Sequence, residues 1–81
     1  MPVDRSDLRG WVLEALTALG GRASILDVCK YVWRNHEADL RKGGDLFFGW
    51  QYDIRWAATE LRKKGLIRST RISPRGIWIK K

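Results

Sequence analysis

The sequence predicts a small α+β domain in which three helices precede a two-stranded β-hairpin. In three segments, near residues 8–19, 25–35 and 51–64, apolar residues recur at intervals of three and four, the spacing of a helix with one buried face. Residues 66–80 instead alternate apolar and polar side chains and are rich in β-branched residues. The chain has 81 residues, 44% of them apolar and 31% charged, which suffices for one compact core. We therefore expect residues 1–81 to form a single domain, either free-standing or a module of a longer protein.

The first two helices have clear start and stop signals. Asp4 or Ser6 can cap the first, and Gly20 and Gly21 end it, because glycine adopts the left-handed C-cap at little cost. The stripe predicted to be buried in this helix consists of Leu8, Trp11, Val12, Ala15, Leu16 and Leu19. Residues 22–23 can pair as a minimal strand. Ser24 then caps a second helix, expected from Ile25 to about Asn35.

The segment HEADLRKGGDLFF, residues 36–48, lacks clear periodicity, and two glycines interrupt any helix there. It is interpreted as a long loop with a short helical turn. His36 is interpreted as a residue at the end of the preceding helix. Long loops in small domains are commonly functional or held down by their own side chains. We expect Phe47 and Phe48 to plug the core.

The third helix is expected from Gly49 or Gln51 to Lys64, with Gly65 closing it. At 100° per residue, one side of this helix gathers the apolar residues Ile54, Ala57, Ala58 and Leu61. The opposite side gathers Tyr52, Trp56, Thr59 and Lys63, and an intermediate flank carries Gln51, Arg55 and Arg62. The helix thus combines an ordinary core face with an aromatic and cationic face that the core does not need.

The remaining residues form a predicted hairpin. LIRSTRI and GIWIKK supply the two strands, and residues 73–76, SPRG, supply the turn. The order helix, connector, helix, helix and hairpin is that of a winged helix-turn-helix.

Charge is distributed unevenly along the chain. Residues 1–40 contain five basic and six acidic side chains, a net charge of −1, whereas residues 41–81 contain eleven basic and three acidic ones, a net charge of +8. A basic surface of this strength attracts polyanions, and double-stranded DNA is the partner that best explains it. A merely solvated charged surface is the alternative.

The segments that carry most of these features also resemble a known family. IRWAATELRKKGLI followed by RGIWIKK resembles the end of the winged-helix domain found at the N-terminus of Mrr-type restriction endonucleases and in related modules of other restriction nucleases, and GGRASILDVCKYV is similar to its opening. The resemblance spans nearly all of residues 8–80, although HEADLRKGGDLFFGWQY departs from the pattern. It implies target recognition for a nuclease fused or associated elsewhere. The family pattern often has a tryptophan at the position of Trp56, which suggests an architectural role for that side chain.

A winged helix places its third helix in the major groove of DNA. The residues expected to reach base edges are Gln51, Tyr52, Arg55, Trp56 and Thr59. Glutamine can pair with adenine N6 and N7, and arginine can bind guanine or a phosphate. The residues expected to hold the DNA backbone, from the loop, the helix end and the wing, are Arg41, Lys42, Arg62, Lys63, Lys64, Arg68, Arg71 and Arg75.

Five tryptophans are many for this length. Trp11, Trp33 and Trp78 have expected packing roles, whereas Trp50 and Trp56 have none in the predicted core. Aromatic walls can bury the N6-methyl group of adenine for roughly 1 kcal/mol. Because related modules belong to modification-dependent restriction enzymes, the resemblance favours DNA containing N6-methyladenine, with Trp50 and Trp56 as candidate walls of a methyl-group pocket.

The sequence does not support catalysis by this domain. It has one histidine and one cysteine, and its carboxylates match no metal-ligand spacing. None of its glycines lies in the strand–loop–helix pattern of a nucleotide-binding loop. We therefore expect no enzyme activity, metal, cofactor, small-molecule substrate or membrane contact. The single cysteine fits the cytoplasm. Two further functions stay open: a stand-alone winged-helix transcription regulator, and a winged helix used for protein–protein contact.

Overall fold

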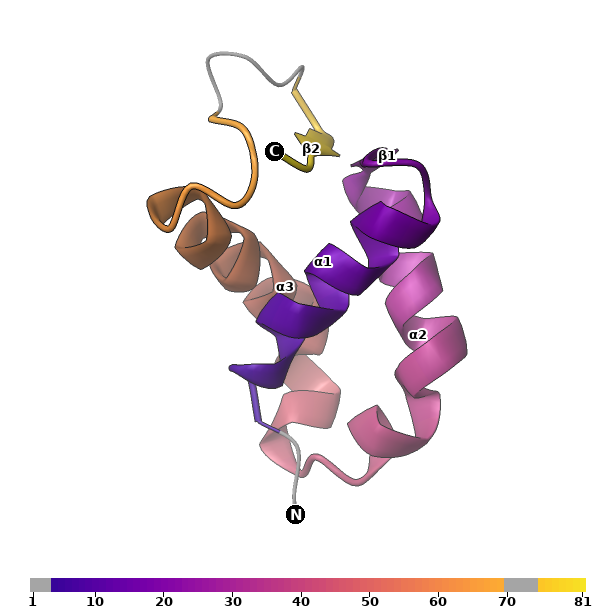
Figure 1. Ribbon diagram of the computed structural model, residues 1–81. Coiled ribbons are helices and arrows are strands. Elements are labelled where there is room, and N and C mark those ends of the chain that lie inside the picture. The colour runs from indigo at the N-terminus through magenta and orange to yellow at the C-terminus, as the bar shows by residue number, and fades with distance from the viewer. Residues whose placement is uncertain (1–3, 70–74) are drawn as a thin grey trace.

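The computed structural model describes residues 4–69 and 75–81, and it contains three helices and two strands (Figure 1). In chain order these are α1 (Asp7–Ala18), β1 (Arg22–Ser24), α2 (Ile25–Arg41), α3 (Asp45–Lys63) and β2 (Ile77–Ile79). The predicted α+β fold, three helices followed by an antiparallel hairpin in a winged-helix layout, is confirmed.

The hairpin arms meet at their base. Ile67 and Lys80 form an antiparallel bridge, and the amide of Arg68 donates to the carbonyl of Ile79 at 2.8 Å. The other edge of β2 pairs with β1, so that Ala23 lies opposite Trp78. The predicted minimal strand at residues 22–23 is thereby confirmed, and it ties the hairpin to the helices. Of the predicted turn, Ser73 and Pro74 lie outside the described residues.

Each helix contributes one apolar stripe to a single core. The side chains of Leu8, Val12 and Leu16 in α1 are fully buried, as are those of Val28 and Val32 in α2. The four apolar residues predicted for the core side of the third helix are all buried, and Trp78 covers the core from β2. Trp11 and Trp33 are partly buried against this core, whereas Leu19 is 40% exposed because α1 ends at Ala18.

The caps agree with the sequence in part. Ser24 Oγ accepts from the amide of Asp27 at 3.0 Å, as expected for the start of α2. Ser6 makes no side-chain cap, and Asp4 instead accepts from the amide of Ser6 at 2.8 Å. Gly20 closes α1 with a φ of 91°, the left-handed conformation for which glycine was expected there.

The predicted long loop over residues 36–48 is wrong. Helix α2 continues to Arg41 through a kink at His36, whose φ of −130° and ψ of 19° are not helical, and α3 begins at Asp45. Leu40 and Leu46 explain the difference, because burying them in the core requires helix on both sides of the glycines. Only residues 42–44 connect the helices. A three-residue turn with glycine is typical of a helix-turn-helix.

The environments of the two phenylalanines differ. Phe47 is half-buried, and its ring centroid lies 6.4 Å from that of Trp33. Phe48 is 86% exposed, so the expectation that it plugs the core is wrong. It points outward because it is four residues before Tyr52 on α3, on the side away from the core.

Candidate nucleic-acid interface

The two flanks of α3 carry opposite charge. Arg55 and Arg62 lie seven residues apart, two helical turns, on one flank, and Asp53 and Glu60 have the same spacing on the other. Between Gln51 and Arg62, therefore, the basic flank carries no carboxylate of its own. This separation determines which side of the helix can approach a polyanion.

The basic flank faces α2 and the hairpin. Burial raises the pKa of the Cys29 thiol in α2, and the positive charge of Arg55 partly offsets that effect. Arg62 Nε donates to the carbonyl of Arg68 in the first hairpin arm at 3.3 Å. The start of α2 in turn meets the second hairpin arm just before β2, since the amide of Ile25 donates to the carbonyl of Gly76 at 3.0 Å.

Exposed cations continue from this flank onto the neighbouring elements. Lys30 of α2 and Arg68 and Arg75 of the hairpin are all exposed. We call the following set the basic face: Lys30, Arg55, Arg62, Arg68 and Arg75. Lys63 and Lys64 extend it at the end of α3, where Lys63 also pairs with Glu60 at 3.4 Å. Arg71, a further predicted backbone contact, lies outside the described residues.

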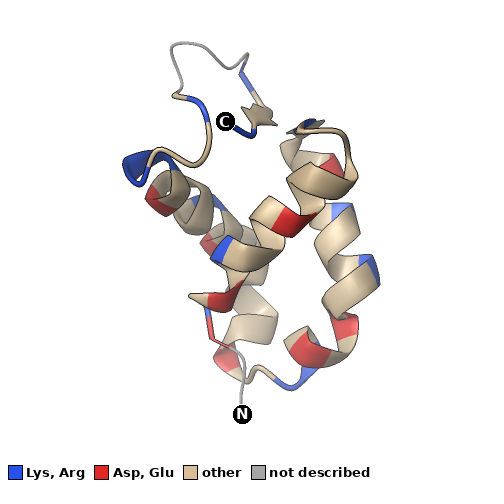
Figure 2. Ribbon diagram, viewed as in Figure 1, with Lys and Arg blue, Asp and Glu red and all other residues tan. Residues whose placement is uncertain are grey.

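Charge is also segregated along the length of the molecule (Figure 2). Lys and Arg gather on the hairpin and the C-terminal end of α3, whereas Asp and Glu predominate near the N-terminus and the α2–α3 turn. Arg41 lies at the acidic end, where its Nε donates to Glu37 Oε2 at 2.8 Å and its guanidinium lies over the rings of Trp33 and Phe47. Lys42 is exposed beside it. The structure therefore separates Arg41 and Lys42 from the basic face.

Four of the five predicted base-reading residues lie together. Tyr52, Arg55, Trp56 and Thr59 line one surface pocket of about 400 Å³, which Arg5 and Asp53 complete. Tyr52 is 80% exposed. The Thr59 hydroxyl donates to the carbonyl of Arg55 at 3.1 Å, so its free lone pair can only accept from a ligand. Gln51 is exposed but lines a different pocket, between α2 and α3.

The two candidate walls of a methyl-group pocket are not brought together. Trp50 is 6% exposed and belongs to the core, so the expectation that it has no packing role is wrong. Its indole stacks on Trp33, with ring centroids 6.1 Å apart and an interplanar angle of 8°. Trp56 is half-buried on the other side of α3, where Arg5 covers it. The burial of Trp50 follows from the earlier start of α3, which extends the core stripe by one turn.

Two functional candidates were missed in the sequence. Phe48 is the most exposed large apolar side chain in the described residues. Its position four residues before Tyr52 would have placed both on one face of the third helix, had the helix been predicted to begin at Asp45. Lys30 was assigned no role because its contribution depends on how α2 packs beside α3.

Other kinds of site find little support in the part of the chain that the structure describes. Over residues 4–69 and 75–81, no three His, Cys, Asp or Glu side chains gather as a metal site requires. None of the described helices is both long and apolar enough to cross a membrane. No protein-family model, curated protein or solved structure matches the chain.

Proposed function

We propose that the protein binds double-stranded DNA through α3 and the basic face. The observation that carries this proposal is the separation of charge across α3, with Arg55 and Arg62 on one flank, where Arg62 bonds to the first hairpin arm, and Asp53 and Glu60 on the other flank. Arg55 and Arg62 can therefore approach phosphates along one edge of the helix, whereas Asp53 lines the pocket of Tyr52 and Trp56 and Glu60 pairs with Lys63. The major groove is wide enough for such a helix.

In this arrangement, bases and backbone are contacted by different residues. Arg55 is placed to bind guanine O6 and N7 or a phosphate, while Tyr52, Trp56 and Thr59 offer contacts to neighbouring base edges. The phosphate contacts fall to Arg62, Arg68 and Arg75, with Lys63 and Lys64 at the helix end. These contacts fix the register of α3 in the groove and carry no sequence information themselves.

The favoured biological role is target recognition for a restriction or modification-dependent endonuclease, with N6-methyladenine in the target. This role comes from the family resemblance of the sequence. The pocket lined by Tyr52 and Trp56 supports it, because two aromatic side chains there can cover a methyl group for roughly 1 kcal/mol. Trp56 then acts without Trp50.

Protein–protein contact is a second candidate, favoured by one observation. Phe48 and Tyr52 are 86% and 80% exposed one turn apart on α3, and exposed aromatic side chains are common anchors of protein interfaces. This function does not require the separation of charge across α3.

A titration that varies salt distinguishes the two. Fluorescence anisotropy of labelled duplexes is measured with plain, N6-methyladenine and 5-methylcytosine versions of the same DNA at several salt concentrations. A protein that neutralises about five phosphates shows a slope of log K against log salt of roughly −4 to −5. Tighter binding to the N6-methyladenine duplex supports the modified-base role, whereas equal affinity for all three removes it. No binding at low salt removes the DNA proposal and favours protein contact.

A further inference from the structure

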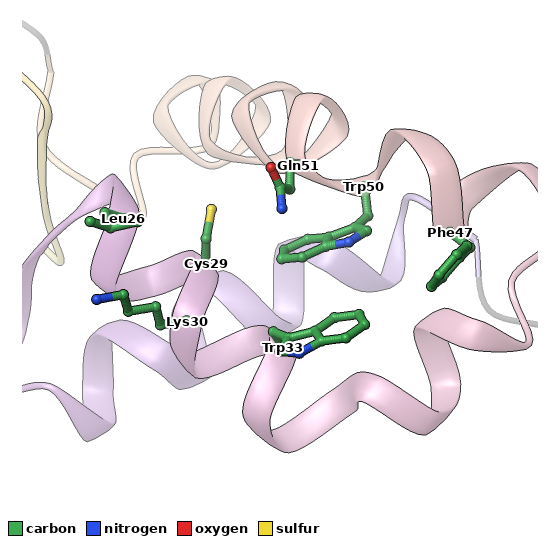
Figure 3. Close-up of a pocket in the computed structure, with 7 residues that line it drawn as sticks. All are labelled: Leu26, Cys29, Lys30, Trp33, Phe47, Trp50 and Gln51. Carbon is green, nitrogen blue, oxygen red and sulfur yellow. The ribbon is translucent and has the colours of Figure 1, made fainter.

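A second pocket, of about 350 Å³, opens between α2 and α3 (Figure 3). One side of it is aromatic, with Trp33 from α2 and Phe47 and Trp50 from α3. The two indoles are nearly parallel, with centroids 6.1 Å apart. A ring inserted between them needs about 7 Å, twice the contact distance of carbon atoms. A planar ligand therefore does not insert between the two rings and meets the pair from the pocket side. Trp50 is 6% exposed there, and the Arg41 guanidinium lies over the Trp33 ring at 5.3 Å.

The remaining lining residues are Leu26, Cys29 and Lys30 from α2 and Gln51 from α3. The Gln51 side chain extends from α3 toward α2, and the Cys29 sulfur points from α2 toward α3 (Figure 3). The amide of Gln51 offers both donors and an acceptor, the combination that pairs with the edge of a nucleobase. Lys30 adds a cation, and no carboxylate lines the pocket. A flat ring with hydrogen-bonding edges and a nearby negative charge is the ligand that suits these groups.

The position of the pocket connects it with the basic face. Lys30 belongs to both, and Arg55 of the basic face comes one helical turn after Gln51, which lines the pocket. The second hairpin arm adjoins the start of α2 through the Ile25–Gly76 hydrogen bond. A nucleic acid strand on the basic face therefore passes the mouth of the pocket.

We propose that the pocket between α2 and α3 accommodates one unpaired base of the bound DNA, with its ring against the Trp33–Trp50 pair and its edge on Gln51. Lys30 and Arg55 hold the phosphates that flank this base. The inference rests on the DNA binding proposed above and extends it, because groove contacts by α3 read only bases that stay in the duplex.

The first test compares a fully paired duplex with the same duplex carrying one unpaired adenine. Unpairing a base costs a few kcal/mol. The second duplex has no base pair to break at that position, so we expect the protein to bind it at least about tenfold more tightly than the fully paired duplex. Gln51→Ala and Trp33→Leu should reduce this preference. Asn35→Ala is the matched control, since Asn35 is an exposed amide of α2 that does not line the pocket, and it should leave the preference unchanged.

The second test uses Cys29, the single cysteine of the chain. An adenine whose N6 tether ends in a mixed disulfide is placed either at the unpaired position or in a paired position several base pairs away. Attack by the Cys29 thiolate releases the leaving thiol and joins the protein to the DNA by disulfide exchange, which is followed on a non-reducing gel. We expect cross-linking from the unpaired position only, and none with Cys29→Ser.

The possible failures are distinct. Absence of binding to every duplex removes the proposed function and this inference together. Binding to duplexes without a preference for the unpaired adenine and without the cross-link removes only the pocket. If free adenosine monophosphate protects Cys29 from alkylation as well as the unpaired duplex does at equal concentration, the pocket takes a free nucleotide, and its assignment to DNA is overturned.

Discussion

The guanidinium of Arg5 lies over the indole of Trp56, with Cζ 4.3 Å from the ring centroid. Arg9 approaches the same ring at 5.9 Å, so two cations from the start of the chain cover the aromatic residue that the sequence placed on the outer face of the third helix. Trp56 also packs against the core. It thus holds the N-terminal segment to α3 while lining the pocket proposed for a methylated base.

This relationship predicts a stability effect that does not involve DNA. Trp56→Ala removes a half-buried indole, and we expect it to lower the free energy of unfolding by about 2 kcal/mol. Arg5→Ala should cost about 0.5–1 kcal/mol through the lost cation–π contact. Urea unfolding of both single variants and the double variant gives the coupling energy. A coupling near zero would show that the contact does not contribute to stability. Trp56→Phe, which keeps an aromatic ring, is then the variant for testing discrimination of methylated DNA.

The wing should contribute to DNA affinity regardless of sequence. Arg75→Ala removes a cation of the basic face, so we expect weaker binding to every duplex and a slope of log K against log salt smaller in magnitude by about 1. The matched control is Lys42→Ala, which removes a likewise exposed cation at the acidic end of the molecule. Similar losses for both variants would contradict the basic face as the binding surface.

The parts of the fold that were predictable depend on local signals. The Ser24 cap, the glycine stop at residues 20–21 and the buried side of α3 each follow from spacing or from one residue's own conformational preference. The parts that were not predictable depend on contacts between distant residues. Helix through residues 37–41 and 45–48 exists because Leu40 and Leu46 reach a core built mainly by other segments.

The candidate site divides in the same way. That Tyr52, Arg55 and Thr59 share a face of one helix follows from helical periodicity, and their common pocket agrees with it. Two other contacts join residues 17 or more positions apart: Arg5 lies over Trp56, and Trp50 stacks on Trp33. Hydrophobic periodicity relates only residues close in the sequence, so it could not predict these contacts. Arg41 was assigned to DNA because the segment around it was interpreted as a loop.

His36 should stabilise the kinked part of α2. Its ring stacks on Trp11 of α1, with centroids 4.1 Å apart and an interplanar angle of 11°, and its Nε2 lies 2.8 Å from Glu14 Oε2. We expect His36→Ala to lower the free energy of unfolding by about 1–2 kcal/mol, because it removes an aromatic contact and a hydrogen bond. Lys42→Ala, an exposed change nearby, should stay within about 0.5 kcal/mol of the parent protein in the same urea experiment.

The effect of the Arg55 charge on the Cys29 thiol predicts a change in thiol reactivity when Arg55 is replaced. The thiolate is the reactive form, and burial raises the pKa of Cys29 while Arg55 lowers it. Replacing Arg55 with alanine therefore raises the pKa further and should slow alkylation by iodoacetamide at a given pH below that pKa. The rate is measured against pH for the parent, Arg55→Ala and Lys42→Ala. An unchanged profile for Arg55→Ala would show that the two side chains are not close in solution.

Two glycines test where α3 begins. Gly44 precedes the helix with a φ of 60° and a ψ of −121°, a backbone conformation that residues with a side chain adopt only with strain. Gly44→Ala should therefore destabilise the protein by about 1–3 kcal/mol. Gly49 lies inside the helix, and an added Cβ there meets only Asp53 Oδ2, at 3.8 Å. Gly49→Ala should therefore stabilise the protein by about 0.5–1 kcal/mol.

Gly10→Ala is the matched control for Gly49→Ala, because Gly10 lies inside α1 and an added Cβ there has no neighbour within 4 Å. We expect both substitutions to stabilise the protein by similar amounts in urea unfolding, since each replaces the flexible residue of a helix interior. If Gly10→Ala stabilises and Gly49→Ala does not, the chain around Gly49 is not helical. The start of α3 would then shift toward Gln51, as the sequence first indicated, and the exposed positions of Phe48 and Tyr52 on one helical face would no longer hold.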